Sequence, residues 1–226
     1  MFPIADDNSE IRIIPFVTYA IITLNVIVFV LLQGLGSNDS FTYAFSLVPK
    51  EIMTGVDITT PPLQPTPSIY LTLVTSMFMH GSIMHIFGNM LFLWIFADNI
   101  ENRIGHFRFI IFYLICGFAA AFGQILMNTS SIIPMLGASG AISGVLGGYL
   151  LLFPNKEVRA IMFSFMMTTV PAFVAVGLWI GYQLLMGFLN SSKSGGVAYA
   201  AHIGGFVAGL VLIKIFAIGT NNSNQS

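Results

Sequence analysis

The sequence predicts an all-α membrane protein with six transmembrane helices in one domain, and three observations lead to this prediction. The composition is 56% hydrophobic and only 8% charged, whereas globular domains hold about 25% charged residues. The apolar residues gather in runs close to the roughly 20 residues that a helix needs to cross a bilayer. These runs use most of the 226 residues, which leaves no room for a second folded domain. A net charge of −1 gives no reason to expect a nucleic-acid partner.

Six predicted spans follow one another along the chain. They are Ile14–Gln33, Ile83–Ile100, Phe107–Met127, Ala138–Phe153, Pro171–Leu189 and Val197–Ile218. The first span begins too late for a cleaved signal peptide, acidic residues precede it, and no small-residue cleavage site follows it. We therefore expect a single domain over residues 1–226, with a short cytoplasmic tail at 1–13 and a disordered tail at 220–226.

The basic residues predict how the bundle is oriented. An even number of spans puts both termini on one side, and most of the eight basic residues fall on that side. These are Arg12, Arg103, Arg108, Lys156, Arg159 and Lys214, whereas Lys50 and Lys193 fall opposite. By the positive-inside rule, both termini are cytoplasmic. The apolar segment Val158–Val170 adjoins two of these basic residues, so we expect it to lie along the cytoplasmic face.

The first external loop, Gly34–Tyr70, is too long for a plain linker. Its first part, Phe41–Met53, mixes aromatic and charged residues and suits the headgroup region of a bilayer. Several prolines between Pro61 and Pro67 then favour extended chain over helix. Loops of this length are usually functional or disordered, and the apolar content favours a packed interfacial structure.

Polar side chains accompany these apolar spans at a few positions. His85 and Asn89 are four positions apart and share one helix face, and His80 lies close before them. Ser139 begins the fourth span, and His202 lies in the sixth. For one such residue, a hydrogen bond to a neighbouring helix is the simpler interpretation. Ionisable residues inside a membrane are costly and usually functional, so the whole set favours a functional site.

Small residues predict that the fourth and sixth spans touch. They are Gly140, Gly144 and Gly148 in the fourth span, and Gly205 and Gly209 in the sixth. Such four-residue spacing lets two helix backbones approach closely. The contact would bring Ser139 within hydrogen-bonding reach of His202. The uncharged loop Asn128–Leu136 must then dip inward for the serine to reach the level of the histidine.

This set of residues predicts a serine nucleophile with a histidine base. A serine hydroxyl reacts well only when a base takes its proton, and neutral imidazole can do so near neutral pH. We expect Ser139 and His202 in these roles, with the Ser139 backbone N–H, His85 and Asn89 as donors to an oxyanion. The carboxylates fall at the cytoplasmic side or in loops, which favours a dyad over a triad. No HExxH pair occurs, so a metal site is the weaker interpretation.

These motifs resemble those of the rhomboid intramembrane serine proteases. The similar strings are HGSIMHIFGN at 80–89, GASG at 137–140, and Ala201-His202 followed by Gly205 and Gly209. The resemblance covers about Leu47–Gly209 and implies a six-helix core that cleaves single-pass membrane proteins in or near their transmembrane segment. It implies no cofactor and no ATP.

The resemblance also implies a role for individual residues. Ser139 looks like the nucleophile and His202 like its base, while His85 and Asn89 match the family's oxyanion donors. Gly137 opens the loop that holds the serine. The stretch Glu101-Asn102-Arg103-Ile104-Gly105 is similar to a Glu-x-Arg-x-Gly stretch of the family, and we expect it to be a structural element.

The chain departs from the family pattern at two places. Some members carry a Trp-Arg pair in the first external loop, and Gly34–Tyr70 has neither residue. Many members place an aromatic residue four positions after the nucleophile to pack on the catalytic histidine, and here that position is Ser143. What orients His202 is therefore open, with an aromatic ring from span five or six as one option. The resemblance also suggests lateral entry of the substrate near span five, which contains Phe173, Trp179 and Tyr182.

Two other functions compete with proteolysis. An inactive relative that binds membrane clients would share the fold but lack the serine or the histidine, and both are present. A channel or transporter would use His80, His85 and His202 as a polar path, but such proteins often show internal repeats, which are not apparent here. The short chain also favours a prokaryotic plasma membrane.

Overall fold

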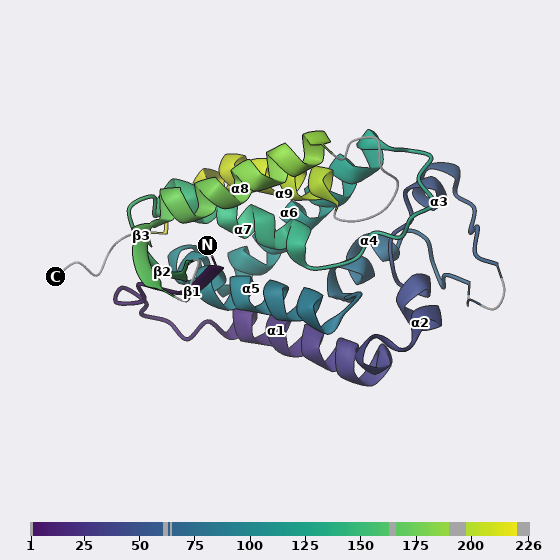
Figure 1. Cartoon of the computed structure of the whole chain (residues 1–226), viewed down its shortest axis with the longest axis horizontal. Helices are drawn as coiled ribbons and strands as arrows, with labels where there is room; N and C mark the ends of the chain where they lie inside the picture. The colour runs from purple at the N-terminus through teal and green to yellow at the C-terminus, as the bar shows by residue number, and fades with distance from the viewer. Residues whose placement is uncertain (1, 61–62, 64, 163–165, 190–197, 221–226) are drawn as a thin grey trace.

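The computed structural model describes residues 2–60, 63, 65–162, 166–189 and 198–220, which form a helix bundle with a small sheet at one end (Figure 1). The longer helices are α1 (Phe16–Ile27), α5 (Ile83–Ile104), α6 (His106–Met127), α7 (Ser139–Leu152), α8 (Ala172–Leu189) and α9 (Tyr199–Phe216). The short ones are α2 (Asp39–Ala44), α3 (Pro49–Thr54) and α4 (Thr72–Thr75). The strands are β1 (Phe2–Asp6), β2 (Glu157–Ile161) and β3 (Met167–Pro171).

All six predicted spans correspond to helices, although not all are long enough to cross a bilayer. By length and composition, four helices of the described chain qualify: α5, α6, α8 and α9. The first and fourth predicted spans correspond to shorter apolar helices, namely α1 with the π-helical turn that extends it to Leu32, and α7. Crossing by these two stays a prediction. Val197, where the sixth span was expected to begin, lies outside the described residues.

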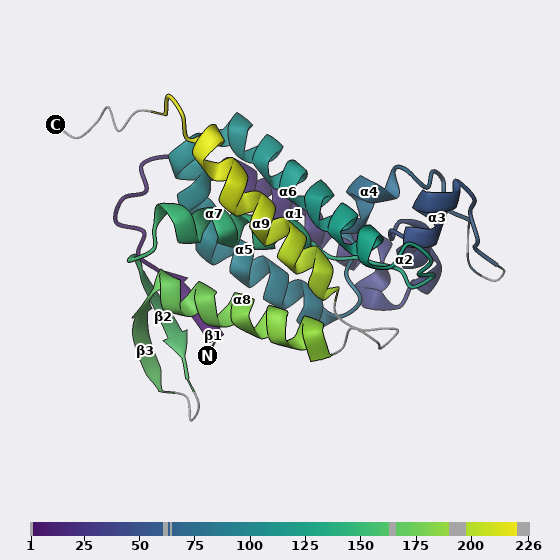
Figure 2. The ribbon, with the colours of Figure 1, turned by 90° about the horizontal axis from the view of Figure 1, so that it is seen from above.

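Helix α7 lies at the centre of the bundle, between α5, α6, α8 and α9 (Figures 1 and 2). Every residue from Gly140 to Tyr149 is buried. Glycines make this possible because they leave room for neighbouring backbones. A Cβ atom on Gly205 would overlap the carbonyl oxygen of Gly140, and one on Gly209 would overlap that of Gly144. The predicted close contact between the fourth and sixth spans is thus confirmed.

The glycines of α7 also serve a second neighbour. A Cβ on Gly140 would lie 2.6 Å from the Cβ of Ala120 in α6, so the missing side chain of Gly140 faces α6 rather than α9. Gly147, which lies outside the predicted repeat, abuts the carbonyl oxygen of Phe206 in α9. The small residues of α7 therefore let two helices approach it from different sides.

The structure contains a three-stranded sheet, so the prediction of an all-α fold is wrong at this end of the bundle. The strands pair antiparallel in the order β1-β2-β3, so most of the described residues of the expected interfacial segment Val158–Val170 belong to the paired strands β2 and β3. The N-terminal segment is more than a tail, because Phe2–Asp6 forms strand β1 and pairs with β2. Residues of β2 alternate between exposed and buried, with Val158 and Ala160 facing the core. This period of two is a strand pattern, too short here to stand out from the surrounding apolar sequence.

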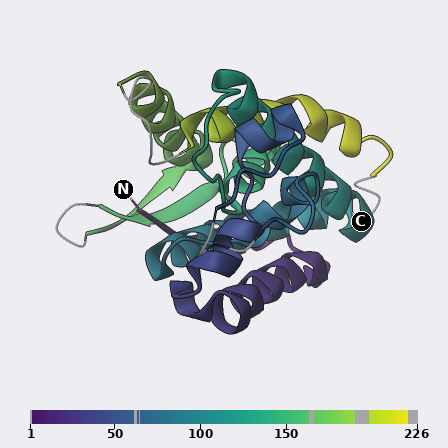
Figure 3. The ribbon, with the colours of Figure 1, turned by 90° about the vertical axis from the view of Figure 1, so that its right-hand side faces the viewer.

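Both described ends of the chain lie at the sheet end of the bundle (Figure 1). Arg108 Nη1 donates to the carbonyl oxygens of Phe216 at 2.9 Å and Ile218 at 2.7 Å, which fixes the end of α9 there. Helices α2 and α3, in the segment expected to form the first external loop, lie at the opposite end and are in front in Figure 3. The predicted tail beyond Thr220 and the basic residue Lys193 lie outside the described residues.

Candidate active site

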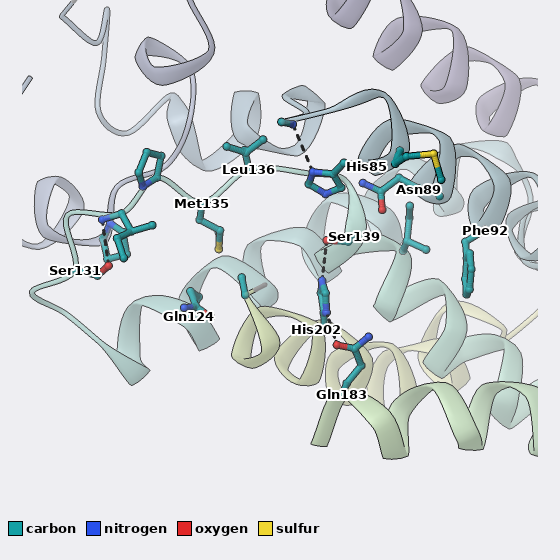
Figure 4. A pocket seen from close by; sticks show the side chains of 18 of the residues that line it. His85, Asn89, Phe92, Gln124, Ser131, Met135, Leu136, Ser139, Gln183 and His202 are labelled. Atoms are coloured by element: carbon teal, nitrogen blue, oxygen red, sulfur yellow. Dashed lines mark hydrogen bonds between the residues drawn. The ribbon is translucent and has the colours of Figure 1, made fainter. Parts of the chain in front are cut away.

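The predicted meeting of Ser139 and His202 is present in the structure. Ser139 is the first residue of α7, and His202 lies in the first turn of α9. The Oγ atom of Ser139 is 2.8 Å from Nε2 of His202, a hydrogen-bonding distance (Figure 4). His202 is buried. The glycine contact between α7 and α9 holds the two side chains at this distance.

The loop before α7 is held in place by backbone contacts with two other segments. Leu47 and Met135 exchange hydrogen bonds of 3.0 and 2.7 Å, and the N–H of Gly137 donates to the carbonyl oxygen of Ser76 at 2.9 Å. Gly137 has φ = +121°, a backbone conformation that residues with a Cβ rarely adopt. A Cβ there would also lie 2.8 Å from Nε2 of His85. Glycine therefore lets this loop approach His85 directly.

His85 and Asn89 project from the first turns of α5 into the same cavity as Ser139 (Figure 4). The N–H of Gly81 donates to Nδ1 of His85 at 3.4 Å, so a neutral His85 carries its proton on Nε2, the nitrogen next to Gly137. The Nδ2 atom of Asn89 lies 2.8 Å from Nε2 of His80. His80, just before α5, is fully buried and orients this amide.

A cavity of about 660 Å³ joins these side chains. Ser139, His202, His85 and Asn89 all line it, together with residues of the loop before α7 and of α8. Its volume is in the range of ligand-binding pockets. The structure thus brings together the four polar side chains that the sequence analysis selected for chemistry.

Two residues of α8 contact His202, and the sequence analysis did not identify Gln183. The Oε1 atom of Gln183 lies 2.9 Å from Nδ1 of His202 (Figure 4). The centroid of the Trp179 ring lies 5.9 Å from that of the imidazole and 6.4 Å from that of the Phe92 ring. The sequence did carry a signal for Gln183: it is an amide in an apolar span, four positions after Trp179. This spacing places both side chains on one helix face.

The serine that replaces the family's aromatic residue has another role. Ser143 Oγ donates a hydrogen bond of 2.6 Å to the carbonyl oxygen of Ser139. The ring beside His202 comes from α8 instead, as Trp179. The other two aromatic residues noted in span five, Phe173 and Tyr182, are exposed.

Metal ligation has no support among the side chains that the structure describes. Within those residues, no group of three histidine, cysteine, aspartate or glutamate side chains could hold a metal ion. The donors around Ser139 are imidazoles and amides, which suit hydrogen bonding to a developing negative charge.

The fold and the site define a helical membrane protein with a serine–histidine pair whose histidine is buried. The family model described as the Rhomboid domain matches residues 67–218. The chain belongs to the rhomboid family.

Three relatives illustrate this similarity. Rhomboid protein 1, mitochondrial, from Saccharomyces cerevisiae is 28% identical over 200 residues, which cover 85% of this chain and 51% of the relative. RHOMBOID-like protein 1 from Arabidopsis thaliana is 32% identical over 147 residues, or 65% of this chain and 34% of the relative. Rhomboid protease GluP from Bacillus subtilis is 28% identical over 197 residues, or 86% and 34%. The chain thus spans about a third to a half of the length of these relatives.

Proposed function

We propose that this protein is an intramembrane serine endopeptidase that cleaves single-pass transmembrane proteins in or near their membrane span. The observation that supports this most directly is the 2.8 Å contact between Ser139 Oγ and His202 Nε2 inside a cavity. Membership of a family that includes a protein named as a protease adds support.

The proposed reaction uses the two side chains in sequence. His202 Nε2 takes the proton of Ser139 as Oγ bonds to the scissile carbonyl carbon, and the carbonyl electron pair moves to oxygen. The C–N bond then breaks, and the proton on Nε2 passes to the leaving amine. Water hydrolyses the acyl-enzyme by the same two steps, with His202 again accepting and then returning a proton.

The negative oxygen of the intermediate needs donors on the side of Ser139 away from His202. Nε2–H of His85, the amide of Asn89 and the backbone N–H of Ser139 are the proposed donors. Gly137 supports this assignment, because its lack of a Cβ keeps the loop close to His85 Nε2. Preorganised donors of this kind act most strongly where water is scarce.

We also propose how the bundle is oriented in its membrane. Arg103 and Arg108 donate hydrogen bonds to Thr220 and Ile218, at the end of the bundle where the N-terminal strand also lies. We propose that this end faces the cytoplasmic or equivalent side. The sequence analysis favoured a prokaryotic plasma membrane. The relatives do not support that choice, because their names include a mitochondrial protein as well as a bacterial one.

The decisive experiment reconstitutes the purified protein in lipid vesicles with a designed single-span substrate protein. We expect cleavage by the parent protein and none by Ser139→Ala or His202→Ala, with unchanged thermal unfolding. A fluorophosphonate probe provides a second readout that needs no substrate: the serine Oγ–P bond forms, the P–F bond breaks, and His202 takes the proton. Undiminished cleavage by a folded Ser139→Ala protein would exclude the proposed nucleophile. A parent protein that binds the substrate, is not labelled and does not cleave would favour the inactive client-binding relative.

A further inference from the structure

We propose that Gln183 is a positioning residue that fixes the proton of His202 on Nδ1 and so leaves Nε2 free to act as the base. This inference rests on the proposed function, because it concerns the same serine–histidine pair. It assigns to an uncharged amide on a different helix the orienting task that a carboxylate performs in a catalytic triad.

The hydrogen-bond geometry fixes the roles of the two imidazole nitrogens. The Oε1 atom of Gln183 has lone pairs and no hydrogen, so across the 2.9 Å contact it only accepts, and Nδ1 of His202 must donate. In a neutral imidazole the other nitrogen then has no hydrogen. Nε2 therefore accepts the hydrogen bond from Ser139 Oγ at 2.8 Å. This tautomer is the one in which His202 can remove the serine proton.

Burial makes this amide an effective partner. Gln183 and His202 are 7% and 8% exposed, so little water competes for Nδ1. An unpaired polar group in such a site carries a desolvation cost, which favours the paired arrangement. Trp179, one turn earlier on the same helix, lies beside the imidazole and limits its rotation. Helix α8 thus fixes both the tautomer and the ring plane of a histidine that belongs to α9.

The contacts that Gln183 and Trp179 make with His202 tie the active site to the seating of α8. His202 is oriented by a helix other than its own, and α8 is the least buried of the four span-length helices, with 22% of its most apolar window buried. The base is therefore in its reactive form only while α8 is seated against α9. The serine–histidine contact alone does not secure the reactive tautomer.

Two substitutions of similar size separate a positioning role from a packing role. Gln183→Met keeps the volume and removes the acceptor, whereas Gln183→Glu keeps an acceptor for Nδ1–H. Leu184→Ala, at an exposed position of the same helix, is the control.

We expect fluorophosphonate labelling of Gln183→Met to slow roughly 10-fold to 100-fold, a part of the roughly 10²–10⁴ that a positioned base contributes. For substrate cleavage, kcat should fall by a similar factor while KM changes little. Gln183→Glu should recover most of the rate, and the control should match the parent.

Nitrogen NMR of histidine-labelled protein provides a readout that does not depend on activity. The His202 signals are those that His202→Ala removes. We expect a proton on Nδ1 in the parent and in Gln183→Glu, and a shift of the proton towards Nε2 in Gln183→Met. The same Nδ1 proton in Gln183→Met, or an unchanged labelling rate beside an active parent, would overturn the inference and leave the proposed protease intact. A parent that shows the Nδ1 proton but neither cleaves nor is labelled would instead refute the proposed function.

Discussion

The two ends of the bundle use polar side chains in different ways. At the sheet end, Glu101 accepts hydrogen bonds from the backbone N–H groups of Val17 at 2.9 Å and Thr18 at 2.7 Å, and from the hydroxyl of Thr18 at 2.7 Å. At the other end, Ser139 and His202 bond to each other and also face a cavity of about 660 Å³.

The sheet end ties distant parts of the chain together. Asp6 of β1 accepts from the Tyr149 hydroxyl at 2.6 Å and from Asn99 Nδ2 at 2.8 Å, and Lys156 donates to Asn99 Oδ1 at 2.6 Å. Glu101 meanwhile caps the start of α1, which explains the structural character of the Glu101–Gly105 stretch. These bonds join the N-terminal strand and α1 to α5 and α7.

The hydrogen-bond partners at the two ends distinguish structural from functional polar residues in this bundle. Structural groups, such as Glu101 and Asp6, direct their hydrogen bonds at backbone and side-chain groups of other elements. Residues at the candidate active site direct part of theirs at space that another molecule can occupy. Substitutions at the sheet end should therefore change stability, and those at the cavity should change activity.

The largest effect should come from a substitution that disrupts the packing on which both ends depend. Gly205→Val puts side-chain atoms where the Gly140 carbonyl oxygen lies, so α7 and α9 must separate. We expect a loss of more than about 3 kcal/mol of stability together with loss of activity, measured by thermal unfolding in detergent and by substrate cleavage. Gly181→Val is the matched control, because a Cβ there has open space. Full stability and activity of Gly205→Val would contradict the close contact.

Asn89→Ala should lower activity far more than stability, although it leaves Nε2 of the buried His80 without its partner. Removing one oxyanion donor costs roughly 10²–10³ in rate, and His85 and the Ser139 N–H remain. The measurement is kcat for a single-span substrate, with thermal unfolding in parallel. If kcat is unchanged, Asn89 only packs against His80, and the cavity end loses one of its proposed donors.

Glu101→Ala should affect stability without activity. It leaves the N–H groups of Val17 and Thr18 without their acceptor, and a buried unsatisfied donor costs about 1–3 kcal/mol. Thermal unfolding should show this loss, whereas fluorophosphonate labelling of the folded protein should match the parent. Glu157→Ala, at an exposed position, is the control. A large drop in the labelling rate at full folding would show that the two ends are coupled.

Asp6 should change how stability depends on pH rather than abolish folding or activity. Burial raises the pKa of Asp6 from 3.8 to about 7, outweighing the Tyr149 hydrogen bond and Lys156, which lower it, while Asp98 adds to the rise. The folded protein therefore holds a proton between these two values that the unfolded chain has lost, so Asp6 makes stability fall as the pH rises through this window. We expect Asp6→Asn to flatten this dependence in unfolding measurements from about pH 4 to about pH 8. An identical pH profile in parent and variant would refute the buried titration.

Much of the bundle was predictable because its signals are local in sequence. Long apolar runs gave the helices, and the spacing of Gly205 and Gly209 gave the contact between α7 and α9. The polar residues His85, Asn89, Ser139 and His202 stood out because each is costly in an apolar segment. The strands were missed, since β2 and β3 have only five residues each and lie beside longer apolar runs.

The sequence by itself determined which long helices form, that α7 and α9 touch through their glycines, and which serine and histidine meet there. These follow from side-chain size and polarity at helical spacing. Only the tertiary structure decided that Gln183, 19 positions before His202, is the partner of its Nδ1 atom, and that residues 2–6 pair with residues 157–161. Both depend on how separate elements are rotated and docked. Many placements bury the same apolar area, and the hydrogen bonds that distinguish them exist only after packing.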